Sequence, residues 1–227
     1  MNFQKHTTLF GFLLGLLFLL YFTSLGLIIV LNWRGLYYHD ISALGIDSHS
    51  GFDRKDITLN FNALMDYSSP LYQGNLSFPT LISSPEGLQH FKEVKDLFLF
   101  FYRLFPVTQL LIIVLFYLII KRRNYQLLKI SAITSISLPL LIGLICSLSF
   151  DSIFLLFHKF VFRNNYWIFS PEKDPIILML PKAYFLHCTY VILATVAFGA
   201  MIQYYLYRSA NFQYRNSSGY NRRTAKQ

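Results

Sequence analysis

The chain has 227 residues, of which 54% are hydrophobic, 18% are aromatic and only 14% are charged. Soluble globular domains carry about 25% charged residues, so this composition argues against a soluble domain. The formal net charge of +9 does not by itself indicate a nucleic-acid partner, because in so apolar a chain the distribution of charge matters more than the total. The two cysteines lie in apolar runs and predict neither a disulfide framework nor a metal site.

Four apolar runs are long enough to cross a bilayer, which takes about 20 helical residues. They comprise residues 8–31, 97–120, 130–150 and 183–206. The first run exceeds the apolar core of a signal peptide, about 7–15 residues, and no small-residue cleavage site follows it. We therefore expect four transmembrane helices, the first of which is a retained anchor.

The distribution of charge predicts the orientation of these helices. All eleven acidic residues lie either between Asp40 and Asp96 or between Asp151 and Asp174. The amino-terminal stub, the loop 121–129 and the tail 207–227 contain basic residues and no acidic ones. Basic segments stay in the cytoplasm, so the sequence predicts a multi-pass cell-membrane protein with both termini cytoplasmic.

The segment 32–96 is then extracellular and long enough for a small cap. Asp53 or Asp56 is expected to cap a helix that ends near Tyr67. Residues 75–81 alternate between apolar and polar side chains in the manner of a strand. Ser84, Pro85 and Glu86 form a strong helix start, since serine caps, proline fits the first helical position and glutamate favours the first turn.

The second extracellular segment, residues 151–182, is short and rich in aromatic side chains, and we expect it to complete the cap. The predicted fold class is therefore a mainly α membrane protein. It consists of four transmembrane helices with a small mixed extracellular cap.

Three histidines lie near the outer ends of three different spans: His90, His158 and His187. A single histidine on an apolar face is more often structural, but ionisable groups at this depth usually face a polar cavity. Glu86 lies four residues before His90, on the same face of the expected helix. There it either orients the imidazole or favours the helix start. Lys95 is placed as an interfacial lysine with its charged end in water.

Motifs of several enzyme classes are missing from the sequence. It contains no H-E-x-x-H, no G-x-S-x-G and no G-x-x-x-x-G-K-[ST] pattern. Their absence argues against a zinc protease, an α/β-hydrolase and a nucleotide-driven pump, and the sequence predicts no metal and no cofactor.

Two blocks resemble those of a known family. Residues 90–98, HFKEVKDLF, are similar to the family block H-x-x-D-V-K-x-L-F, with Glu93 in the place of the aspartate. The second block comprises Phe157-His158, residues 164–167, residues 174–177 and Leu180-Pro181. The chain thus resembles the lipoprotein intramolecular transacylases of Gram-positive bacteria over nearly its whole length.

The resemblance implies four transmembrane helices under an extracellular cap and two catalytic histidines, which match His90 and His158. It also implies transfer of the sn-2 acyl chain of a diacylated lipoprotein onto the α-amino group of its own N-terminal cysteine. The residues expected to bind substrate or to support the histidines are Glu86, Lys95, Asn164, Trp167 and Asp174.

The chemistry favours His158 as the general base and His90 as the acid or oxyanion donor, although these roles can be exchanged. The reaction needs no cofactor, and its partners are the lipoprotein and membrane lipid, without nucleic acid. Two alternatives stay open at this point. One is a non-catalytic membrane scaffold or chaperone, and the other is an acyltransferase that uses an external phospholipid donor.

Overall fold

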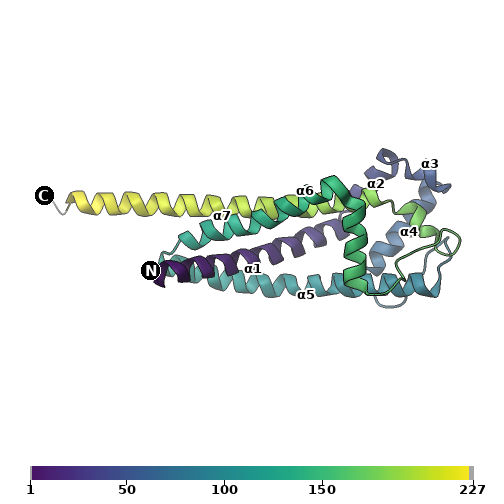
Figure 1. The fold of residues 1–227 in the computed structure, drawn as a ribbon, viewed down its shortest axis with the longest axis horizontal. Helices are drawn as coiled ribbons and strands as arrows, with labels where there is room; N and C mark the ends of the chain where they lie inside the picture. Colours follow the sequence, from purple (N-terminus) through teal and green to yellow (C-terminus); the bar gives the residue numbers. More distant parts are fainter. Residues whose placement is uncertain (1, 225–227) are drawn as a thin grey trace. The chain divides into compact units, whose positions relative to one another are not determined.

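The computed structural model describes residues 2–224, in which all regular structure is helical (Figure 1). The elements are α1 (Asn2–Asn32), α2 (Arg34–Ala43), α3 (Ile46–Ser50), α4 (Arg54–Tyr67), α5 (Pro85–Arg122), α6 (Gln126–Phe162), the 3-10 helix η1 (Pro175–Met179) and α7 (Lys182–Thr224). Helices α1, α5, α6 and α7 are long and apolar enough to cross a membrane. The four expected apolar helices are therefore present, and the chain is a multi-pass membrane protein.

The chain forms two compact units. Within the described residues, the first unit comprises residues 2–23, 105–141 and 193–224, and the second comprises residues 24–104 and 142–192. Each of the four long helices contributes residues to both units.

Close backbone approach holds the first unit together. A Cβ atom added to Gly15 would lie 2.5 Å from Cβ of Thr134, and one added to Gly199 would lie 2.3 Å from the ring of Phe22. Only glycine fits at these two positions, so α1 packs tightly against α6 and against α7. Small residues allow such contacts between membrane helices.

A buried polar cluster also joins α6 to α7 in the first unit. The hydroxyl of Ser131 donates to Oε1 of Gln203, and Nε2 of Gln203 donates to the hydroxyl of Ser135 at 3.2 Å. All three residues are buried. Because every group finds its partner within the unit, the cluster adds interhelical hydrogen bonds at little desolvation cost.

The second unit has an aromatic core built from the short helices. The rings of Tyr37 on α2 and Phe61 on α4 are stacked with their centroids 3.6 Å apart. The hydroxyl of Tyr37 donates to the carbonyl oxygen of Met179 in η1 at 2.7 Å. Burial raises the pKa of Tyr37, so the hydroxyl stays protonated and able to donate.

Two predicted helix starts are confirmed. The carboxylate of Asp53 accepts a hydrogen bond from the backbone N–H of Asp56 at 2.7 Å, so Asp53 caps α4. The hydroxyl of Ser84 accepts one from the N–H of Gly87 at 2.9 Å, and α5 begins at Pro85. Each cap satisfies an amide that the helix itself leaves without a partner.

The predicted strand at residues 75–81 is wrong, and with it the mixed composition of the cap. This segment is irregular, and no strand occurs within residues 2–224. Leu76 and Phe78 are buried while their neighbours are exposed, so the alternation in the sequence is real. The alternation arises because the chain is extended here and buries every second side chain. A β-strand also needs a hydrogen-bonded neighbouring strand, which this segment lacks within the described residues.

Helices α5 and α6 extend beyond what a bilayer requires. With 38 residues, α5 is about 57 Å long, against about 30 Å of hydrocarbon. Helix α6 is interrupted at Ser149, which has non-helical dihedral angles, and it changes direction there (Figure 1). Residues 150–162, assigned by sequence mostly to a loop, therefore continue as helix within the second unit.

Candidate active site

The second unit brings together two of the three predicted histidines. His90 lies on the first part of α5, and His158 lies on the last part of α6. Their ring centroids are 5.9 Å apart and the rings are tilted by 38°. A substrate group beside both imidazoles can exchange protons with each of them.

His90 sits in an aromatic environment and is only 6% exposed. The rings of Phe162, Phe169 and Phe91 lie with centroids 4.6, 5.5 and 5.9 Å from its own. Its Nδ1 atom is buried and forms no hydrogen bond with any residue that the structure describes. A buried polar atom without a partner is costly, and this one is available to a substrate oxygen.

His158 is oriented by its own helix. Its Nδ1 atom lies 2.8 Å from the carbonyl oxygen of Phe154. Because a carbonyl oxygen only accepts, we assign the proton of the neutral ring to Nδ1, which leaves the lone pair on Nε2. The ring also packs on Phe154 and Trp167, with centroids 4.1 and 5.1 Å away.

Asn164 connects the loop after α6 to α5. Its Nδ2 atom donates to both carboxylate oxygens of Glu93, at 3.1 Å each. Its backbone carbonyl accepts from Nε1 of Trp167 at 2.8 Å. Two of the predicted site residues, Asn164 and Trp167, are therefore in contact, and Trp167 also packs on His158.

Sequence reasoning did not include Glu93 among the site residues, although it noted the substitution there. The available signal was the acidic residue one helical turn after His90, on the same face of α5. Its contact with Asn164 is not visible in sequence, because the two residues are far apart in the chain.

Asp174 holds the start of α5. It is 4% exposed, and its two carboxylate oxygens accept from the backbone N–H of Ser84 at 2.8 Å and from the Ser84 hydroxyl at 2.7 Å. The second block is thus joined to the start of the helix that carries the first block. Asp174 supports the helix that carries His90 rather than touching either imidazole.

Glu86 and Lys95 lie away from the histidine pair. Glu86 is exposed and forms no hydrogen bond with His90. Nζ of Lys95 donates to the carbonyl oxygen of Tyr72 at 3.1 Å and lies 4.3 Å from the ring centroid of Tyr67. Lys95 therefore fastens the irregular segment after α4 to α5.

His187 belongs to a different contact. Its Nδ1 atom lies 2.8 Å from a carboxylate oxygen of Asp40, which is 1% exposed. This pair joins α7 to α2 within the second unit. Among the residues that the structure describes, no three His, Cys, Asp or Glu side chains are grouped to hold a metal ion.

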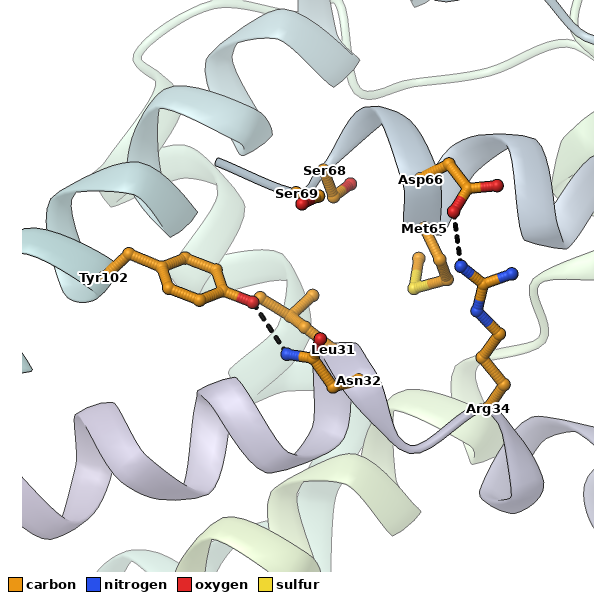
Figure 2. A pocket seen from close by; sticks show the side chains of 8 residues that line it. All are labelled: Leu31, Asn32, Arg34, Met65, Asp66, Ser68, Ser69 and Tyr102. Atoms are coloured by element: carbon orange, nitrogen blue, oxygen red, sulfur yellow. Dashed lines mark hydrogen bonds and ion pairs between the residues drawn. The ribbon is translucent and has the colours of Figure 1, made fainter. Parts of the chain in front are cut away.

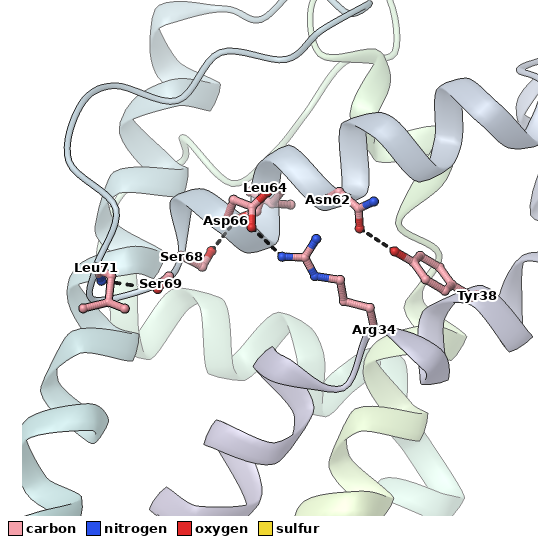
Figure 3. A network of polar contacts seen from close by, with 8 residues as sticks. All are labelled: Arg34, Tyr38, Asn62, Leu64, Asp66, Ser68, Ser69 and Leu71. Carbon is pink, nitrogen blue, oxygen red and sulfur yellow. Dashed lines mark hydrogen bonds and ion pairs between the residues drawn. The ribbon is translucent and has the colours of Figure 1, made fainter.

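A cavity of about 120 Å³ lies elsewhere in the second unit, where α1 ends, and none of the site residues lines it (Figure 2). On one side Nδ2 of Asn32 donates to the hydroxyl of Tyr102 at 2.7 Å. On the other, Arg34 pairs with Asp66 (Figure 3). The cavity is distinct from the histidine pair, because neither His90 nor His158 lines it.

Comparison with known proteins identifies the family. Residues 12–185 match the family model described as lipoprotein intramolecular transacylase Lit. A solved structure of the membrane-integral lipoprotein intramolecular transacylase Lit from Bacillus cereus is 32% identical, with a TM-score of 0.87. The match covers 93% of this chain and 99% of that one.

Two further structures of the Bacillus cereus protein carry a histidine replaced by arginine and by alanine. Both are 32% identical to this chain, with TM-scores of 0.83 and 0.82. The matches cover 95% and 94% of this chain, and 97% and 98% of those. A search among curated proteins gave no match. The family model and the structures together show that this chain is an acyltransferase and belongs to the lipoprotein intramolecular transacylases.

Proposed function

We propose that the protein transfers the sn-2 acyl chain of a diacylglyceryl lipoprotein onto the α-amino group of the same cysteine, with His158 as general base and His90 as its acid partner. The product is an N-acylated lipoprotein that keeps one acyl chain on its glycerol. The proximity of the two imidazole rings in a buried aromatic environment is the observation that carries this proposal.

The proton steps follow from the environment of each ring. The amine nitrogen attacks the ester carbonyl carbon, and Nε2 of His158 takes the proton that the nitrogen loses. The assigned tautomer favours this role, because Nδ1 of His158 already bonds the carbonyl of Phe154. The carbon–oxygen bond to glycerol then breaks, and that oxygen receives a proton from His90. The proton that His158 holds passes to His90, so both rings end neutral, as they began.

His90 suits the second role because its Nδ1 atom is buried without a protein partner. A donor held in a dry environment stabilises developing negative charge more strongly than one in water. No acyl-enzyme is needed, since nucleophile and ester are on one molecule and the proton lost during attack is returned to the glycerol oxygen.

The protein's main contribution is ordering of the substrate. Attack closes an eight-membered ring of amine nitrogen, Cα, Cβ, sulfur, two glycerol carbons, ester oxygen and carbonyl carbon. Such a ring closes slowly in solution because several bonds must stop rotating together, and a shaped site supplies that order in advance. Trp167 and Phe162, packed on the histidines, are suited to confine the acyl chains.

The site is proposed to lie at the extracellular surface of the membrane, where diacylated lipoproteins reside. This assignment rests on charge, since the acidic residues fall in segments 32–96 and 151–182 while both termini are basic. Spans at 97–120 and 130–150 then place His90 just before one span and His158 just after another. The other two spans are residues 8–31 and 183–206. With four spans, both termini, the loop 121–129 and the tail 207–227 lie in the cytoplasm.

Mass spectrometry of the N-terminal peptide of a reporter lipoprotein tests this proposal. The reporter is produced with the intact protein, with His158→Ala and with an empty vector. The expected result is acyl transfer to nitrogen at unchanged total mass with the intact protein alone. Full transfer by His158→Ala would remove His158 from the mechanism. A gain of one acyl chain would indicate an external phospholipid donor.

A further inference from the structure

We propose that the carboxylate of Glu93, fixed by Asn164, is the binding site for the α-ammonium group of the lipoprotein's N-terminal cysteine. This inference rests on the proposed function and names the group that recognises the nucleophile. It assigns a role to a charged side chain beside the histidines that the catalytic steps above leave unused.

Glu93 is held in place without being neutralised. Asn164 donates to both of its oxygens at 3.1 Å, and Nε2 of Gln89 donates to Oε1 at 3.2 Å. All these donors are uncharged amides. Together they occupy part of the acceptor capacity of the carboxylate, which is about four lone-pair positions, and leave the rest for a ligand.

No cation among the described residues forms an ion pair with this carboxylate. Glu93 is only partly exposed, and no lysine, arginine or histidine nitrogen of the described residues lies within 4.0 Å of its oxygens. Lys95 lies two residues further along α5, on another face of the helix, and is turned to Tyr72 and Tyr67. A partly buried, rigidly held anion without a cationic partner favours a cationic ligand.

The substrate carries such a cation at the required place. A free α-amino group has a pKa of about 7.7–8.0, so at neutral pH most of it is a primary ammonium. Its three N–H donors match carboxylate acceptors, and charge-assisted hydrogen bonds of this kind are roughly twice as strong as neutral ones. The diacylglyceryl part of the same substrate is uncharged.

The position of Glu93 relates binding to the reaction. It lies one turn beyond His90 on the same face of α5. Asn164, which fixes Glu93, also accepts the indole N–H of Trp167, and Trp167 packs on His158. An ammonium bound at Glu93 is thus delivered beside the histidine pair. It releases one proton to water to become the nucleophile, and His158 takes the second proton during attack.

Binding of unreactive analogues tests the inference. The two probes are a cysteinyl peptide carrying a dialkyl-ether glyceryl group with a free amine, and the same peptide N-acetylated. Neither can transfer an acyl chain, so each Kd reports recognition alone. The protein, in detergent micelles, is compared with Glu93→Gln, Glu93→Asp and Asp96→Asn, the last being an exposed acid three residues further along α5.

The wild-type protein is expected to bind the free-amine probe about tenfold more tightly than the acetylated one. Glu93→Gln, which keeps size and a hydrogen bond to Asn164, should reduce the preference to within about twofold of unity. Glu93→Asp and Asp96→Asn should keep a clear preference, because both leave a carboxylate at position 93.

Two results would overturn the inference: no preference in the wild-type protein, or the full preference in Glu93→Gln. The second would mean that Glu93 only ties the loop to α5. The first needs no variant, so the test holds even if Glu93→Gln does not fold. Transfer by the wild-type protein to a reactive diester lipopeptide is measured in parallel. If transfer occurs without a preference, the inference fails and the proposed function stands, whereas lack of transfer counts against the proposed function itself.

Discussion

The side-chain amide of Asn164 contacts both carboxylate oxygens of Glu93 at 3.1 Å, and this contact joins the loop after α6 to the helix that carries His90. The same loop supplies Trp167 to the ring of His158. An interaction between the two sequence blocks therefore helps to hold the two histidines close together. Substitutions in this part of the protein can distinguish residues that take part in the reaction from residues that only hold the histidines in position.

His90→Phe is expected to abolish transfer while leaving the protein at least as stable as the wild type. Phenylalanine keeps the packing on Phe162 and Phe169 and removes a buried nitrogen that has no described partner. Loss of a general acid typically lowers the rate by at least about a hundredfold. Thermal unfolding in detergent and the reporter assay measure the two properties. His39→Ala, at an exposed histidine, is the control, and substantial transfer by His90→Phe would contradict the assigned role.

Asp174→Ala is expected to lower the free energy of unfolding by about 1.5–3 kcal/mol, because two hydrogen bonds to a buried carboxylate are lost. Asp174→Asn should cost less, since one oxygen still accepts. Limited proteolysis between Arg163 and Asp174, together with thermal unfolding, reports the release of this loop. Glu172→Ala, an exposed acid in the same loop, serves as the matched comparison. Equal behaviour of the alanine variants at 172 and 174 would rule out a structural role for Asp174.

Asp40 and His187 are expected to be energetically coupled. Removing His187 leaves a carboxylate that is 1% exposed without its partner, so the single variants His187→Ala and Asp40→Ala should each be strongly destabilising. The double variant should be less destabilised than the sum, with a coupling of about 1–3 kcal/mol. Unfolding of all four proteins under identical conditions completes the cycle. Additive effects would show that the contact contributes little.

Asp66→Asn is expected to change stability by less than about 1 kcal/mol and to leave transfer unaffected. The side chains of Arg34 and Asp66 are 34% and 56% exposed, and exposed ion pairs contribute little. Neither residue touches the histidine pair, and the cavity they line is separate from it (Figure 2). A marked loss of transfer in this variant, at unchanged stability, would assign that cavity a part in substrate binding.

Features that depend on local chemistry could be predicted from the amino-acid sequence. Runs of apolar residues give the four long helices, because a helix satisfies its own backbone hydrogen bonds in a bilayer. The helix starts at Asp53 and Ser84 could be predicted because a cap is local. It needs only a side-chain oxygen two or three residues before a backbone N–H of the first helical turn. The family resemblance, carried by short blocks around His90 and His158, was also legible in the chain and is confirmed.

Contacts between side chains far apart in the chain could not be predicted in this way. The alternation at residues 75–81 resembled a strand, but whether an extended segment pairs depends on a neighbour that the segment does not encode. The contacts of Glu93 with Asn164 and of Ser84 with Asp174 join residues far apart in the chain. Such pairs are fixed by how the helices and loops pack, since hydrogen bonds need partners within about 3 Å whatever their separation in sequence.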